Sequence, residues 1–135
     1  MNTGRFVGAG VAVFVVRSIL NYLFYGMLIH GQYEALDAAH PGIMREVIPA
    51  YLVLDLITAF VLVYLFVKAG AAFGGGMKGG VSIGIVLAII AIICNLYWFY
   101  SLQIYPPNLL GIETVYMLVA YAIQGAVAAA VYKTA

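Results

Sequence analysis

The chain has 135 residues, of which 66% are hydrophobic and only 8% are charged, and its formal net charge is +1. Soluble globular domains carry about 25% charged residues. This chain has too few charged residues to form a surface that is exposed to water on all sides. The near-neutral charge gives no indication of a nucleic-acid partner. The single cysteine, Cys94, excludes a disulfide framework and a thiolate metal site, and its apolar surroundings predict a buried, inert side chain. Composition therefore predicts a membrane protein.

Four apolar stretches follow one another along the chain. A membrane-spanning helix needs about 20 mostly apolar residues, and the stretches of this length are 6–29, 47–67, 81–103 and 109–132. Only short connections remain, so the sequence predicts an all-α fold, in which residues 1–135 form a single up-down bundle of four transmembrane helices. The first stretch imitates a secretory signal peptide. However, its apolar run resumes after Arg17 and no small-residue cleavage site follows, so we interpret it as a retained helix.

The basic residues predict the orientation of this bundle, because cytoplasmic loops carry an excess of Lys and Arg. Those on the side of the termini are Arg5, Lys68, Lys78 and Lys133. The connection 30–46, on the other side, holds three acidic residues and only Arg45. Both termini are therefore expected in the cytoplasm. Aromatic residues predicted to form a belt at the opposite interface are Tyr22, Tyr25, Tyr33, Tyr51, Tyr97, Trp98, Tyr100 and Tyr105.

Two opposite charges interrupt the first two apolar stretches. At a rise of about 1.5 Å per residue, Arg17 lies roughly 16 Å from the cytoplasmic boundary and Asp55 about 18 Å from it. Charges at the centre of a membrane are costly and usually pair with one another, so we expect an ion pair between the two. Asn21, Asn95 and Glu113 fall at or above this depth, and the sequence predicts one buried polar layer that contains all five residues. Gln124 is expected to lie well below it.

Three interpretations of the polar layer follow from the sequence. The ion pair fixes the register of the first two helices, or the layer is a functional site such as a proton relay, an ion path or a ligand pocket. In the third, Arg17 extends to lipid phosphate and never meets Asp55. About thirteen Val, Leu, Ile and Phe residues in the first helix each favour insertion by roughly 0.3–0.6 kcal/mol. They outweigh the penalty of about 2.5–3.5 kcal/mol for the arginine, so insertion does not require a functional role for it.

Small residues recur every four positions at the start of the third helix, namely Gly76, Gly80, Gly84 and Ala88. Such a ridge lets another helix approach closely, and the segment 124–132 of the fourth helix offers a matching surface. We expect these two helices to touch near the cytoplasm. The glycine-rich segment 74–80 lacks the Gly-Lys-Ser/Thr ending of a nucleotide-binding loop and is interpreted as a flexible loop that runs into a helix.

The connections between the helices contain no pattern typical of a metal, cofactor or catalytic site. His30 and His40 are ten residues apart, which no helical spacing brings together, so we expect solvated side chains and no metal or cofactor site. The segment 31–39 is predicted to form a short interfacial helix, and 105–111 a tight turn in which Asn108 caps the following helix. The sequence shows no serine or cysteine nucleophile with a histidine at a shared depth. It therefore predicts a protein that is not an enzyme.

Four segments resemble a family of small bacterial four-helix integral membrane proteins of unknown function: "NYLFYGMLIHGQYEA", "MREVIPAYLVLDL", "YPPNLLGIE" and "IQGAVAAAVYK". The resemblance implies a multi-pass protein of the bacterial inner (plasma) membrane with this architecture, and it implies no catalytic residues.

Two functions are compatible with these observations. The first is a non-enzymatic packing or accessory component, whose partners are the lipid bilayer and either further copies of the chain or a larger membrane complex. The second is a small oligomeric transporter or channel that uses the buried polar layer for proton or ion coupling.

Overall fold

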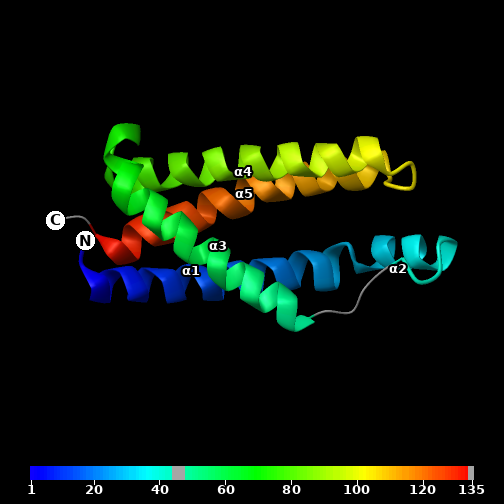
Figure 1. Cartoon of the computed structure of the whole chain (residues 1–135), viewed down its shortest axis with the longest axis horizontal. Coiled ribbons are helices and arrows are strands. Elements are labelled where there is room, and N and C mark those ends of the chain that lie inside the picture. The colour runs from blue at the N-terminus through cyan, green and yellow to red at the C-terminus, as the bar shows by residue number, and fades with distance from the viewer. Residues whose placement is uncertain (44–47, 134–135) are drawn as a thin grey trace.

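The computed structural model describes residues 1–43 and 48–133, and these residues form helices and turns without a β-strand (Figure 1). In chain order the elements are α1 (Thr3–Leu23), the π-helical turn η1 (Phe24–Leu28), α2 (His30–Ala39), α3 (Ile48–Ala69), the 3-10 turn η2 (Gly70–Phe73), α4 (Gly76–Ser101) and α5 (Pro107–Tyr132). Helices cover most of the described residues of the four apolar stretches, and the short helix expected within 31–39 is present.

Local chemistry sets the ends of the long helices. α1 begins three residues earlier than predicted because Asn2 caps it, its side-chain oxygen accepting from the backbone N–H of Arg5 at 3.0 Å. α4 begins at Gly76 because Gly74, Gly75 and Gly76 take positive φ angles and complete the turn before it. The segment 74–80 is therefore a short glycine turn that runs into α4, as the sequence predicts. The predicted Asn108 cap was wrong, since α5 begins at Pro107, a favoured first residue.

Four helical segments are long and apolar enough to cross a membrane: Thr3–Leu28, Pro49–Phe73, Gly76–Ser101 and Pro107–Tyr132. At most 28% of the most apolar window of each is buried inside the structure. Most of their large apolar side chains therefore face outward, as bilayer-facing helices require and as soluble bundles avoid. Cys94 is among the outward-facing residues, so the prediction of a buried thiol was wrong.

Different elements of the chain lie at the two ends of the bundle. The chain termini meet at one end, where the Arg5 Nη1 donates to the Lys133 carbonyl oxygen at 2.7 Å and the backbone N–H of Asn2 donates to the Tyr132 hydroxyl at 3.1 Å. The turn η2 lies at this same end, whereas α2 and the turn between α4 and α5 lie at the other (Figure 1). α4 and α5 run side by side, α3 crosses α1, and α1 also packs on α5.

Small residues allow α4 and α5 to touch through their backbones. A Cβ atom added to Gly84 would overlap the Tyr121 carbonyl oxygen, and one added to Gly80 would overlap that of Gly125. Ala88, the next member of the predicted ridge, is fully buried. Gly76 does not belong to the contact, because it is exposed and open space surrounds the position of its missing Cβ. Gly79, three residues later, is buried, but it packs against the carbonyl of Gly70 in the turn η2 and not against α5.

Candidate functional site

Arg17 and Asp55 form an ion pair between α1 and α3. The Arg17 Nε donates to Asp55 Oδ1 at 2.8 Å, and the side chains are 15% and 13% exposed. Asn21, one turn after Arg17, donates from Nδ2 to the same carboxylate oxygen at 3.1 Å. Two donors from α1 therefore converge on one oxygen of the Asp55 carboxylate of α3. The pairing at equal depth that the sequence predicts is present, and the alternative in which Arg17 never meets Asp55 was wrong.

Three side chains of α5 complete this first cluster. The Arg17 Nη1 donates to Gln124 Oε1 at 3.3 Å, and the guanidinium lies 5.1 Å from the centre of the Tyr121 ring, within the range of a cation–π contact. The Tyr116 hydroxyl donates to Asn21 Oδ1 at 2.6 Å. Arg17 thus links α1, α3 and α5. Gln124, which was expected to lie outside the polar layer, reaches Arg17 through its long side chain.

Asn95 and Glu113 belong to a second cluster at the far end of the bundle. Glu113 of α5 is 2% exposed, and its carboxylate accepts from Asn95 Nδ2 of α4 at 2.7 Å. The hydroxyls of Tyr33, on α2, and Tyr105, in the turn before α5, also donate to it. The single polar layer predicted from depth is therefore two clusters: Asn95 serves Glu113 and makes no hydrogen bond to the Arg17–Asp55 pair.

Aromatic rings fill the space between the two clusters. Phe24, in the π-helical turn, stacks on Tyr116 with ring centres 3.9 Å apart. Tyr25 lies edge-on to Tyr116 at 5.8 Å and 6.1 Å from Tyr33, so its ring contacts one member of each cluster. The π-helical turn accommodates an extra residue where α1 approaches α2, a distortion that recurs at functional sites. Tyr25, Tyr33 and Tyr105 are half-buried, with their rings or hydroxyls turned toward other groups of the protein. The interfacial belt expected for them stays a prediction.

The phenols around Glu113 are held in their protonated form. Burial raises the pKa of Tyr33 above its ordinary value of 10.0, and the hydrogen bond to Glu113 and the charge of that carboxylate raise it further. The same causes, in the same order, raise the pKa of Tyr105. A protonated phenol is a donor, so both hydroxyls remain available to Glu113 up to strongly alkaline pH.

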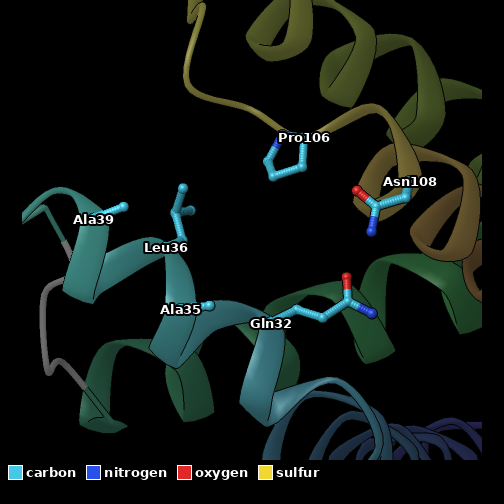
Figure 2. Close-up of a pocket in the computed structure, with 6 residues that line it drawn as sticks. All are labelled: Gln32, Ala35, Leu36, Ala39, Pro106 and Asn108. Atoms are coloured by element: carbon cyan, nitrogen blue, oxygen red, sulfur yellow. The ribbon is translucent and has the colours of Figure 1, made fainter.

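The structure contains two hollows near these clusters. A cavity of about 90 Å³ lies between α1, α4 and α5, and its polar lining comes from Arg17, Asn21, Gln124 and three tyrosines. A wider groove of about 310 Å³ separates α2 from the turn that precedes α5. Figure 2 shows Gln32, Leu36 and Asn108 facing this groove. Among the described residues, no charged side chain lines it.

Other candidate groups remain apart. His30 pairs with Glu34 at 3.0 Å on the exposed surface of α2. Within residues 1–43 and 48–133, no three His, Cys, Asp or Glu side chains are grouped so that they could hold a metal ion.

Comparison with known proteins yields no match: no family model, curated protein or solved structure resembles the chain significantly. The resemblance to a four-helix bacterial family stays a prediction.

The sequence contains signals for the partners that depth alone did not find. Glu113 and Gln124 are eleven residues apart, which is close to three turns and places them on one face of α5. The Cα–Cβ bond of a helical residue tilts toward the N-terminus of its helix. Arg17 therefore leans toward the end where the termini meet, and Gln124 leans away from it, so that the two side chains converge.

Proposed function

We propose that the chain is a multi-pass protein of the bacterial inner membrane that acts as a non-enzymatic packing or accessory component. The observation that carries this proposal is the distribution of its side chains. Four apolar helices direct most of their large side chains outward, while Arg17, Asp55 and Glu113 are hydrogen-bonded inside the bundle. The described residues outside the four long helical segments amount to short connections and the helix α2.

The proposed topology is an up-down bundle with both termini in the cytoplasm. The contact between Arg5 and Lys133 supports it, since it joins the start of α1 to the end of α5. Lys68 and Lys78 flank the turn η2, which lies at the same end of the bundle. The excess of basic residues at this end favours a cytoplasmic location.

Labelling of single cysteines tests the topology. In a Cys94→Ala background, Gln32→Cys should react with an impermeant thiol reagent in intact cells. Ala72→Cys, in η2 at the opposite end, is the matched control and should react only after the cells are permeabilised. The reversed pattern would overturn the orientation.

α3 provides the surface through which such a component would pack. Between Tyr51 and Ile57 the large apolar side chains are all exposed, and Asp55 is the buried residue among them. In this half of α3, contact with the rest of the protein is concentrated on one side, and the remaining sides are free for lipid or for another protein.

Photo-crosslinking in native membranes tests the packing function. A benzophenone amino acid at Leu54, which is 58% exposed on α3, should give a discrete protein adduct. Val115, which is 63% exposed on α5, is the matched control and should give mainly lipid adducts. Lipid adducts alone at both positions would overturn the proposal.

A second candidate function is an oligomeric transporter or channel. The cavity beside Arg17 and the cluster around Glu113 favour it, since both lie among helices that are long enough to cross a membrane. A cavity of about 90 Å³ is too small for a continuous pathway, so an oligomer interface would have to complete it. Ion or proton flux in proteoliposomes that Arg17→Leu abolishes would favour this candidate over the first.

A further inference from the structure

Gln124 is a fully buried amide with one half unused. It is 0% exposed, its oxygen accepts from Arg17, and its Nε2 has no hydrogen-bond partner among the described residues. Leaving a buried amide N–H without a partner is costly, and such groups in proteins are nearly always satisfied. Gln124 lines the cavity between α1, α4 and α5, so an acceptor for its N–H groups would lie there.

Hydrogen-bond donors outnumber free acceptors around this cavity. A guanidinium has five N–H donors. Within the described residues Arg17 directs one to Asp55 and one to Gln124 and lies against Tyr121, so it still has N–H groups for a ligand. Asn21 is engaged on both sides, because its amide donates to Asp55 and its oxygen accepts from Tyr116. The hydroxyl of Tyr25 makes no hydrogen bond within the described part of the chain, and its side chain lines the same cavity.

We propose that this cavity binds one small monovalent anion, held by the Gln124 amide and the free N–H groups of Arg17. Its volume of about 90 Å³ corresponds to about three water molecules or to a compact anion such as formate or nitrate. The walls between the donors are apolar, formed by Ala91, Met117 and Ala120, so the ligand would contact donors on one side and apolar groups on the other.

Asp55 competes with such an anion for Arg17. Its carboxylate does not line the cavity and approaches Arg17 from the Nε side. An anion in the cavity is therefore attracted by Arg17 and repelled by Asp55, and directional hydrogen bonds decide whether it stays. The other side chains around the pair are Asn21 on α1 and Tyr116, Tyr121 and Gln124 on α5, none of which carries a formal charge at neutral pH. Removing the charge of Asp55 should consequently strengthen binding.

This site goes beyond the proposed function, because a protein that acts only by packing needs no ligand. If crosslinking detects no protein partner, the proposal of an anion site is unaffected. If the chain binds no anion, the packing proposal is likewise unaffected, so the two proposals are tested independently.

Equilibrium dialysis of the purified chain in detergent tests the site. The probe is ¹⁴C-formate, and gluconate is the only other anion. The wild type should bind formate saturably at about one per chain. Gln124→Leu should weaken binding about tenfold, since it removes one donor to a charged ligand. Gln103→Leu, at an exposed glutamine outside the cavity, is the matched control and should bind as the wild type does.

Two further measurements identify the mechanism and the source of the anion. Asp55→Asn keeps the shape of the side chain without its charge, and should bind formate more tightly than the wild type. Octanoate as a competitor distinguishes a free anion from the carboxylate of a lipid: a free-anion site favours formate, and a lipid carboxylate site favours octanoate. The proposal is overturned if the wild type shows no saturable binding, or if Gln124→Leu binds formate as well as Gln103→Leu does.

Discussion

Two helix pairs in this protein are held together by opposite means. α4 and α5 touch through their backbones, and glycines at positions 80, 84 and 125 leave no room for a further atom. α1 and α3 are joined near the middle by the long side chain of Arg17, which reaches Asp55, and by the ring of Phe60, which covers Gly10. In a bilayer the first arrangement gains from close packing and the second from pairing charges that lipid would leave unpaired. The first pair should therefore be sensitive to volume, and the second to charge.

Breaking the charge pair is expected to have the largest effect. Arg17→Leu leaves the Asp55 carboxylate with Asn21 as its remaining donor, and Asp55→Leu leaves the Arg17 charge with Gln124 and the Tyr121 ring. Removing one partner of a buried ion pair costs about 3–5 kcal/mol. Each single change should lower the free energy of unfolding in detergent by about this amount.

The double change Arg17→Leu with Asp55→Leu provides the internal control. Because no buried charge then remains, much of the loss should be recovered, as a double-mutant cycle would measure. If the double variant is no more stable than the weaker single variant, the pair does not stabilise the contact between α1 and α3.

The volume-sensitive pair can be tested with a single methyl group. Gly84→Ala places a Cβ against the Tyr121 carbonyl, which is backbone and cannot move alone, so we expect destabilisation of about 1–3 kcal/mol. Gly10→Ala meets the ring of Phe60, which can rotate away, and should cost less. Gly8→Ala, with open space around the new atom, should be neutral or stabilising by about 0.5–1 kcal/mol. Thermal unfolding in detergent ranks the three variants, and equal effects at Gly84 and Gly10 would contradict the distinction.

The sequence allows much of this comparison to be predicted, for clear physical reasons. Long apolar runs define the four helices, and only one pair of opposite charges lies at a similar depth in consecutive stretches. The small-residue ridge is visible as a four-residue period, apart from Gly76, which the glycine turn places outside the contact. Depth measured along the helix axes separates groups that long side chains bring together, which is why the contact between Gln124 and Arg17 was not predicted.

The hydrogen-bond partners of Glu113 could not be predicted from the order of residues along the chain. Tyr33 approaches Glu113 because α2, which follows the π-helical turn, lies opposite the turn that precedes α5, and the sequence carries no simple signal for the π-helical distortion. Tyrosines near the end of a membrane helix are typical of an interfacial belt. The exposed tyrosines, such as Tyr97 and Tyr100, fit that expectation, whereas Tyr33 and Tyr105 point inward to a carboxylate.

A third means of holding helices, a phenol donating to a buried carboxylate, attaches α2 and is expected to have the smallest effect. Tyr33→Phe removes one of three donors to Glu113 and should lower the free energy of unfolding by about 1 kcal/mol.

The contribution of the Tyr33 hydroxyl to stability should depend on pH. The folded pKa of Tyr33 is raised above the ordinary value of 10.0, so its contribution is fully present below pH 10 and is lost as the pH rises toward the folded pKa. Unfolding measured by urea between pH 8 and 11 should show the wild type losing stability above pH 10 more steeply than Tyr33→Phe. Tyr100→Phe, at a tyrosine that is 82% exposed, is the matched control and should follow the wild-type curve. If Tyr33→Phe and the wild type have parallel curves, the hydroxyl of Tyr33 does not hold α2 to Glu113, and this helix is attached by apolar contacts alone.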